Sequence, residues 1–156
     1  MAYPDTHYLE LSIKQAEQAR INGNHPFGAV LVDHHGELLL AAENSVITHK
    51  DVTAHAEINL VRAATRSFSA GQLANCSLYA SAEPCPMCAS AIVWANIRRV
   101  VFGLGMSELY KIFGDTGDAP TLKMESRKLF EAAPWPVSVL GPMMEERALE
   151  PHRNFW

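Results

Sequence analysis

Two short motifs, far apart in the chain, constrain this protein more than any other feature of its sequence. The first is Thr53-Ala54-His55-Ala56-Glu57, and the second is Pro84-Cys85-Pro86-Met87-Cys88. One imidazole and two thiolates form the mixed nitrogen and sulfur donor set that zinc prefers. If His55, Cys85 and Cys88 bind one ion, the fold has to bring the two motifs to the same place.

Three protein ligands leave one tetrahedral position open, as in zinc sites that hold a water molecule for catalysis. Glu57 follows His55 by two residues and is therefore available as a general base and acid rather than as a fourth ligand. The alternative is a closed structural site with Cys76 as the fourth ligand. Because the strand expected to start at Cys76 would end about 20 Å away, near the Cys85 loop, we interpret Cys76 as a small buried core residue.

Size and composition indicate a soluble globular protein. The 156 residues suffice for one domain with a core and are too few for two, so we expect a single domain over 1–156. The net charge of −4 argues against a broad nucleic-acid surface. The sequence shows no signal peptide and no apolar run long enough for a membrane span. With two of three cysteines assigned to metal, these features favour the reducing cytoplasm.

Hydrophobic periodicity and turn residues predict alternating strands and helices. The expected strands are a hairpin over 27–42, a strand ending at Ala82, and strands over 99–104 and 137–140. The expected helices cover 7–21, the stretch after Thr53, Pro86 to Asn96, 122–132 and Pro142 to about Glu150. Residues 44–53 read as a polar connector, and 107–121 as a short helix followed by a polar loop. Strand–helix–strand alternation favours parallel pairing, whereas the hairpin is antiparallel. We therefore expect a three-layer α/β/α sandwich around a mixed five-stranded sheet.

The order H-x-E followed by P-C-x-x-C resembles the pattern of zinc nucleobase deaminases. From about Phe27 through Phe102 the chain is similar to the cytidine-deaminase-like superfamily, which has this three-layer fold. The resemblance implies one Zn²⁺ per chain and hydrolytic deamination. Glu57 would take a proton from the attacking water and return it to the departing ammonia.

Several residues narrow the resemblance to one branch of that superfamily. Asn44, the stretch Cys76-Ser77-Leu78-Tyr79, the P-C-P-M-C form and Val93-Trp94-Ala95 resemble the branch that holds bacterial guanine deaminases and tRNA adenosine deaminases. By this resemblance Asn44 contacts the base and the Ala56 backbone lies close to it, with Phe27 as a further substrate-binding candidate. The alternative for Asn44 is a turn residue at the end of a strand.

The C-terminal region separates the two enzymes of that branch. The tRNA enzymes carry a basic C-terminal helix, whereas residues 144–150 here include three glutamates and would repel phosphates. Guanine deaminases carry a late acidic loop and an aromatic tail, and Asp115 and Phe155-Trp156 occupy comparable positions. Asp115 has two interpretations, a residue that recognises the purine or a solvated loop residue.

The chain ends in a helix and aromatic tail over 142–156. Two rings left in water would each forgo about 2 kcal/mol of burial, so we expect them to dock. Phe155 and Trp156 either pack on their own domain as an ordinary helix end, or close over a deaminase pocket, their own or that of a partner chain. Exchange of tails between subunits would follow the guanine-deaminase relatives and would require a homodimer.

The sequence therefore predicts a zinc-dependent aminohydrolase of a free nucleobase or small aminated heterocycle, with guanine favoured. It predicts a homodimer whose tails can be exchanged, with neither nucleic acid nor membrane as a partner. The alternatives are a tRNA adenosine deaminase, a cytosine or nucleoside deaminase, and a zinc-stabilised module without catalysis. The presence of Glu57 argues against the last, because a structural site would not need that carboxylate.

Overall fold

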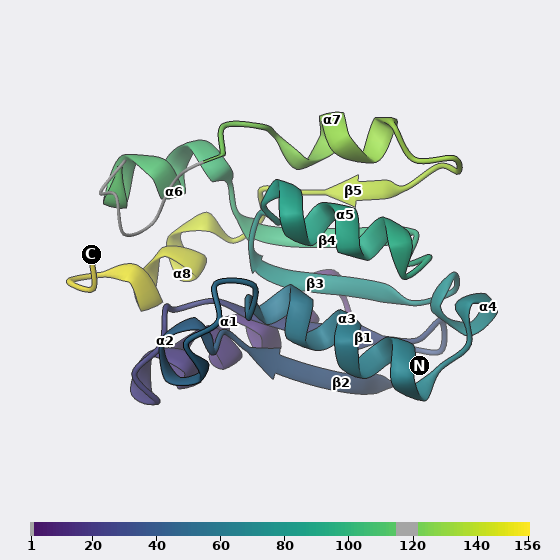
Figure 1. Cartoon of the computed structure of the whole chain (residues 1–156), viewed down its shortest axis with the longest axis horizontal. Coiled ribbons are helices and arrows are strands. Elements are labelled where there is room, and N and C mark those ends of the chain that lie inside the picture. The colour runs from purple at the N-terminus through teal and green to yellow at the C-terminus, as the bar shows by residue number, and fades with distance from the viewer. Residues whose placement is uncertain (1, 115–121) are drawn as a thin grey trace.

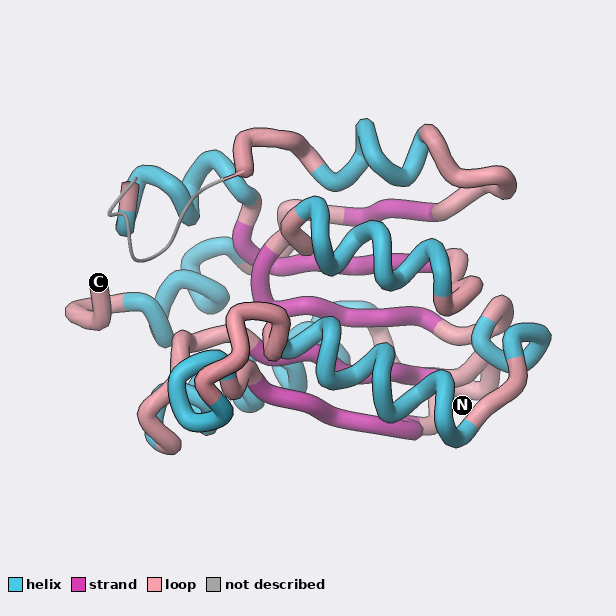
Figure 2. The backbone as a smooth tube through the Cα atoms, in the orientation of Figure 1, coloured by secondary structure: helices cyan, strands magenta, loops and turns pink. Residues whose placement is uncertain are grey.

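The computed structural model describes residues 2–114 and 122–156. Figure 1 shows the arrangement of the elements and Figure 2 their types along the backbone. The strands are β1 (Gly28–Val32), β2 (Leu38–Glu43), β3 (Ser77–Ala82), β4 (Arg99–Leu104) and β5 (Ser138–Leu140). The helices are α1 (Asp5–Ile21), α2 (Val46–His49), α3 (Ala56–Ser67), α4 (Ala70–Leu73), α5 (Pro86–Trp94), α6 (Met106–Phe113), α7 (Ser126–Glu131), α8 (Glu145–Leu149) and a 3₁₀ turn η1 (Glu150–His152).

The strands form one mixed sheet in the order β2-β1-β3-β4-β5. β1 pairs antiparallel with both β2 and β3, whereas β3–β4 and β4–β5 are parallel. The helices between the parallel strands supply the crossovers that parallel pairing requires. The expected five-stranded α/β/α fold is confirmed, and the expectation of a single domain stays a prediction.

Helices cover both faces of the sheet (Figure 1). α3, α5 and α7 lie on one face, and α1 and α8 on the other. Successive residues of β1 alternate between two apolar clusters: Leu31 packs with Leu60 of α3, whereas Val30 packs with Leu9 of α1. This alternation is the two-residue period of a strand that is buried on both faces.

α1 touches β1 backbone to backbone. A Cβ on Gly28 would lie 2.2 Å from the carbonyl oxygen of Ser12 and 2.5 Å from the backbone nitrogen of Ala16. Only a residue without a side chain permits this approach. α1 is therefore seated directly on the strand that leads back to residues 25–27.

The zinc motifs meet because of the order of the strands. β3 ends at Ala82 and the chain then enters the loop that starts α5. α3 and α5 pack side by side on the same face of the sheet and begin at the same end (Figures 1 and 2). The carboxyl ends of parallel strands are where open α/β sheets build their sites.

Several short helical segments differ from the sequence-based expectations, and α7, expected to start at residue 122, begins at Ser126. α2 lies in the expected polar connector, because the Asn24 side-chain oxygen accepts hydrogen bonds from the backbone nitrogens of Ile47 and Thr48, at 3.1 and 3.0 Å. α4 was not expected. The last helix begins at Glu145 rather than Pro142, because Met144 has a left-handed backbone with φ of 57°. None of the described helices is both long and apolar enough to cross a membrane.

Candidate metal centre and active site

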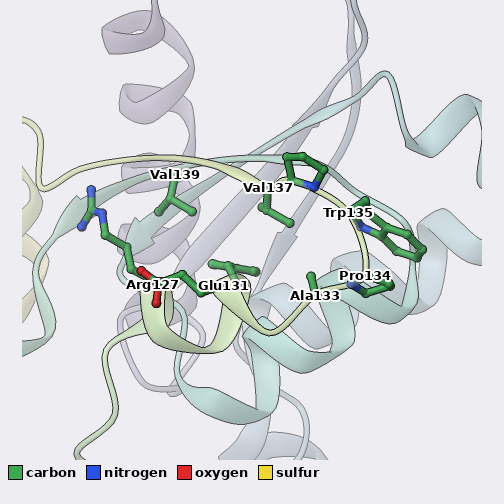
Figure 3. Close-up of a pocket in the computed structure, with 9 residues that line it drawn as sticks. Arg127, Glu131, Ala133, Pro134, Trp135, Val137 and Val139 are labelled. Carbon is green, nitrogen blue, oxygen red and sulfur yellow. The ribbon is translucent and has the colours of Figure 1, made fainter.

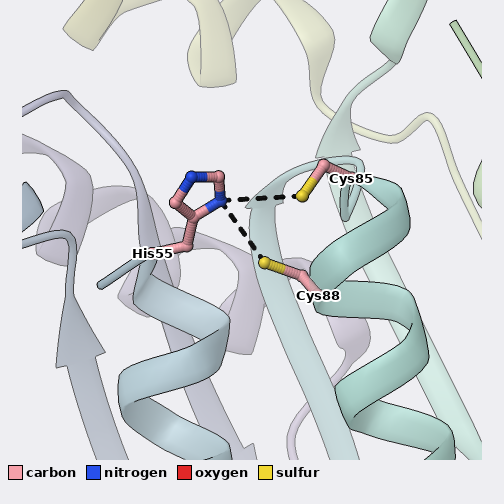
Figure 4. Close-up of side chains that lie close together, drawn as sticks. All are labelled: His55, Cys85 and Cys88. Atoms are coloured by element: carbon pink, nitrogen blue, oxygen red, sulfur yellow. Dashed lines mark hydrogen bonds between the residues drawn. The ribbon is translucent and has the colours of Figure 1, made fainter. Parts of the chain in front are cut away.

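The first turns of two helices carry the motif residues. His55 is the residue before α3 and Glu57 is the second residue inside it. Cys85 is the residue before α5, and Pro86 opens that helix so that Cys88 lies in its first turn. Figure 4 shows the imidazole of one helix start facing both sulfurs of the other.

The donor atoms have the spacing that a tetrahedral zinc ion requires. His55 Nδ1 lies 3.6 Å from Cys85 Sγ and 3.4 Å from Cys88 Sγ, and the three donor atoms all lie within 4.8 Å of one another. Zinc bonds of about 2.3 Å to sulfur and about 2.0 Å to nitrogen separate such donors by about 3.5 Å in a tetrahedron. The residues present therefore fit zinc, with His55 Nδ1 as the nitrogen ligand.

Cys76 takes no part in this group. It is a free cysteine, 4% exposed, and its thiol donates to the backbone oxygen of Gln72 at 3.4 Å. Its place in the core beneath α3 and α5 confirms the interpretation as a small apolar residue. Within the described residues, three protein ligands therefore form the group, which leaves a tetrahedral position open.

The electrostatics of the cysteines favour a bound cation. Hydrogen bonds from Cys88, together with the charge of His55, lower the pKa of Cys85 to about 4. The same pairing with Cys85, burial and the nearby Glu57 carboxylate raise the pKa of the Cys88 thiol. A divalent cation would remove the repulsion that keeps the second thiol protonated.

Glu57 is a buried carboxylate beside the metal ligands. It is 6% exposed, and its Oε2 accepts a hydrogen bond from Cys88 Sγ at 3.6 Å. Burial raises the pKa of Glu57 to about 7, and the positive charge of His55 only partly offsets this. Such a carboxyl group exchanges a proton readily near neutral pH.

A cavity of about 460 Å³ opens next to these groups. Its lining includes His55, Glu57 and Cys85. Phe27, Asn44 and Trp156, which the sequence predicted to bind substrate, also line it. Its remaining residues are His25, Val46, Val52, Glu83, Met87, Met106, Leu109, Tyr110, Phe113 and Leu122.

Of the other residues predicted to bind substrate, Phe155 and Ala56 are not among those that line the cavity. Phe155 packs instead beside Arg20, whose guanidinium lies 5.5 Å from the centre of its ring. The side chain of Ala56 is buried, and as the first residue of α3 its backbone N–H has no partner within the helix. Asp115 lies outside the described residues.

Asn44 is both a turn residue and a cavity residue. It is 2% exposed, and its Oδ1 accepts a hydrogen bond from the backbone nitrogen of Val46 at 3.0 Å. Its amide nitrogen makes no hydrogen bond to any residue that the structure describes. The oxygen therefore fixes the side chain, while the two N–H groups remain available to a ligand.

His25 lines the cavity and was not singled out in the sequence. Its ring centre lies 5.3 Å from that of Trp156 and 6.1 Å from that of Phe155. Burial, followed by the charge of His55, lowers the pKa of His25 and favours its neutral form. No local pattern marks this histidine, because its ring partners come from the other end of the chain.

The C-terminal tail is held against its own chain. Arg20 Nη1 donates to the backbone oxygens of Pro151 and Arg153 at 2.8 and 2.6 Å. Trp156 Nε1 donates to Nδ1 of the buried His152 at 3.1 Å. The Trp156 ring then lies 4.5 Å from Phe113 and 6.3 Å from Phe27, so the tail and α6 meet at the cavity.

A second hollow lies between α7 and β5 (Figure 3). Arg127, Trp135 and Val139 are among the residues that line it, and its lining contains neither histidine nor cysteine. It therefore offers neither an imidazole nor a thiolate to a metal ion.

An imidazole, two thiolates and a buried carboxylate at two helix starts on a mixed sheet define a zinc-dependent deaminase site. The chain belongs to this family, since the model for the cytidine and deoxycytidylate deaminase zinc-binding region matches residues 3–104. The family implies a hydrolytic enzyme that uses zinc.

Its relatives differ in the substrates that their names give. The chain is 42% identical to a probable cytosine deaminase of Schizosaccharomyces pombe over 152 residues, 97% of this chain and 92% of that protein. It is 47% identical to a guanine deaminase of Bacillus subtilis over 77 residues, 49% of each. A solved structure from work on A-to-I editing by tRNA:A34 deaminases has a TM-score of 0.73 at 31% identity, covering 94% of this chain and 99% of that one.

Proposed function

We propose that this protein hydrolytically deaminates a free nucleobase or a small aminated heterocycle and releases ammonia. The observation that carries this proposal is the position of Trp156 in the same cavity as His55 and Glu57. The tail ring packs against Phe113, so a base that is still attached to a polynucleotide would have to displace it. A free flat ring fits beside the aromatic wall without doing so.

The roles of the metal-site residues follow from their positions. His55 Nδ1, Cys85 and Cys88 would hold a zinc ion, which would supply an activated water as the nucleophile near neutral pH. Glu57 accepts the proton that the water loses and donates it to the departing amine. Its raised pKa suits both directions of transfer at neutral pH.

The proposed substrate contacts lie beside the metal ligands and on the aromatic wall of the cavity. The free amide N–H groups of Asn44 and the N–H of Ala56 at the start of α3 are suited to a carbonyl oxygen of the ring. Phe27 and Trp156 supply apolar faces for stacking. Asp115 and Phe155 remain proposed contacts from the resemblance alone.

The tail would act as a cover for the reaction. Excluding water around the attacking nucleophile strengthens the electrostatic interactions inside the site. In the structure Trp156 reaches the cavity of its own chain, so a homodimer with exchanged tails is not needed to place it. That homodimer, and a cytoplasmic location, remain predictions from the sequence.

Guanine is the base that the sequence favours, and cytosine is a second candidate. The similarity to a probable cytosine deaminase extends over 97% of the chain, whereas that to a guanine deaminase covers 49%. Both bases carry an exocyclic amine beside a ring nitrogen, together with a carbonyl oxygen, so both meet the donors described above.

The C-terminal helix argues against tRNA as the substrate. Arg147 of α8 pairs with the carboxylates of Glu10, Glu17 and Glu150, at 2.7, 2.8 and 2.9 Å. This cation is therefore engaged within the fold, and the surrounding glutamates repel phosphate groups.

The decisive experiment measures ammonia release by the purified zinc-loaded protein. Guanine, cytosine, adenine, their nucleosides and a tRNA anticodon stem are compared side by side. We expect turnover of a free base and no salt-sensitive binding of the RNA stem. Turnover restricted to the RNA stem, or micromolar affinity for it that falls steeply with salt, would overturn the proposal.

A further inference from the structure

Among the described residues, the carboxylates of Glu57 and Glu83 line the cavity, and their hydrogen-bond partners differ. Glu57 contacts a metal ligand and no other described side chain donates to it. Glu83 lies in the loop between β3 and α5, two residues before Cys85. Both oxygens of Glu83 are occupied by donors from another part of the chain.

The Glu83 carboxylate binds the starts of two helices. Oε1 accepts from the backbone nitrogen of Met106, the first residue of α6, at 3.0 Å. Oε2 accepts from the backbone nitrogen and from the hydroxyl of Ser126, the first residue of α7, both at 2.8 Å. The backbone nitrogen of Glu83 donates to the oxygen of Leu104 at 2.8 Å, immediately before α6.

Neither helix has a side-chain cap of its own. The residues that precede them, Gly105 and Glu125, make no side-chain capping bond. A helix start leaves backbone N–H groups without partners, and a negative charge there is favourable. Glu83 therefore caps both helices from a distant loop, with bonds that are stronger because the acceptor is charged.

Of the two helices that Glu83 caps, α6 forms one wall of the cavity. α6 contributes Leu109, Tyr110 and Phe113. The hydroxyl of Tyr110 donates to the backbone oxygen of Leu122 at 3.1 Å, which joins the segment before α7 to the same wall. A shift of the α6 start would therefore move the surface that faces Trp156.

We propose that Glu83 is the positioning residue that fixes the α6 wall to the zinc loop, with the start of α7 held by the same carboxylate, and thereby sets the distance between the substrate-binding surface and the metal. This inference rests on the proposed function, since it assigns the wall to substrate. Glu83 is not a proton carrier, because three donors already occupy its two oxygens.

The test compares Glu83→Gln with a matched control, Glu131→Gln. Glutamine has nearly the same shape, but its NH₂ group faces a donor at one of the two helix starts and cannot accept from it. Glu131 is an exposed glutamate of α7 outside the cavity. Zinc content, KM, kcat and the hydrogen exchange of the Met106 and Ser126 backbone amides are measured for each variant.

We expect Glu83→Gln to keep its zinc, to raise KM at least tenfold and to change kcat less than threefold. The two amides should exchange at least tenfold faster, whereas Glu131→Gln should leave all four quantities at the wild-type values. A kcat that falls a hundredfold at unchanged KM would make Glu83 a proton carrier and overturn the proposal. Amide exchange at the wild-type rate would also overturn it.

Ser126→Ala provides a second route if Glu83→Gln does not fold. It removes one of the two bonds to Oε2 and should raise KM about threefold with kcat unchanged; an unchanged KM contradicts the proposal. The exchange measurements require no substrate. If the wild-type protein turns over no base, the proposed function is wrong. Faster exchange of the two amides in Glu83→Gln would then still show that Glu83 caps the two helices.

Discussion

The cavity has two halves that are built in different ways. The metal half consists of His55, Glu57, Cys85 and Cys88, all in the first turns of α3 and α5, which pack on the sheet beside each other. The wall half consists of α6, His25 and Trp156. Its parts come from the beginning, the later part and the end of the chain, and they are joined by ring contacts and a few hydrogen bonds.

We infer from this difference that the metal half carries out the reaction and that the wall half selects the substrate. The metal half depends on helices that are anchored in the core, so the positions of its ligands follow from the fold itself. The wall half can change with single contacts, such as those of Glu83 or Arg20, without disturbing the metal ligands. Relatives that are 42% and 47% identical to this chain but carry the names of different substrates are consistent with this division.

The largest expected effect comes from breaking the metal half at its carboxylate. Glu57→Gln should retain zinc and lower kcat about 10³-fold or more, because it removes the group that carries the proton. The measurement is kcat together with the zinc content of the same sample. Cys88→Ala is the complementary control, because it removes a metal ligand and should therefore lose zinc.

Loss of zinc from Glu57→Gln would make this carboxylate a ligand. Full activity in that variant would remove it from the reaction. Either result contradicts the roles given above.

A tenfold effect is expected from breaking the wall half at the tail. Deleting residues 153–156 should lower kcat or raise KM at least tenfold, because Trp156 then no longer covers the cavity. Zinc content and Tm should remain close to those of the whole chain. Early unfolding, or kinetics identical to the wild type, would show that the tail is structural or idle.

A point variant sharpens the same comparison. Trp156→Ala should reproduce most of the effect of the deletion. Trp94→Ala is the matched control, because Trp94 is 89% exposed and lies outside the cavity. A larger loss of activity in Trp94→Ala than in Trp156→Ala would contradict a role for the tail.

The smallest effect is expected from pH. Burial, and then the charge of Arg20, lower the pKa of His152 to about 4, whereas an unfolded histidine titrates near about 6.5. The unfolded state therefore binds the proton more tightly, so this contribution to stability is complete above about pH 6.5 and is lost as pH falls towards 4. The loss is at most about 1.4 kcal/mol per pH unit.

The measurement is the free energy of unfolding between pH 7 and pH 5. His152→Gln removes the titration and should show a flatter dependence than the wild type, with a lower stability at pH 7 if the bond to Trp156 is weakened. Parallel curves for the two proteins would mean that His152 does not carry this pH dependence.

The metal half could be predicted from the sequence because its information is local. His55 and Glu57 are neighbours, and Cys85 and Cys88 are one turn apart, so the type and spacing of residues suffice once the sheet brings the motifs together. The mixed sheet also followed from local patterns, the apolar run of β1 and the alternation of strands with helices. α4 carried a usable signal as well, since Ser69 and Gln72 form a capping box.

The wall half could not be predicted in the same way because its contacts join distant segments. Glu83 adjoins the second motif, but its partners Met106 and Ser126 lie in helices whose own starts show no cap. The position of His25 in the cavity wall depends on ring contacts with Phe155 and Trp156 of the tail. α2 likewise depends on Asn24, a residue far outside it.

The close packing of α1 on β1 lets one helix position two parts of the cavity wall, the loop before β1 and the C-terminal tail. At one point α1 lies against Gly28, the residue after the loop that carries His25 and Phe27. Near its C-terminal end, α1 carries Arg20, which donates hydrogen bonds to the backbone oxygens of Pro151 and Arg153 in the tail that ends at Trp156. A single added methyl group at position 28 would displace α1 and carry the loop and the tail with it. A substitution outside both zinc motifs could thus alter which molecules this enzyme accepts, and position 28 is a target for changing its selectivity.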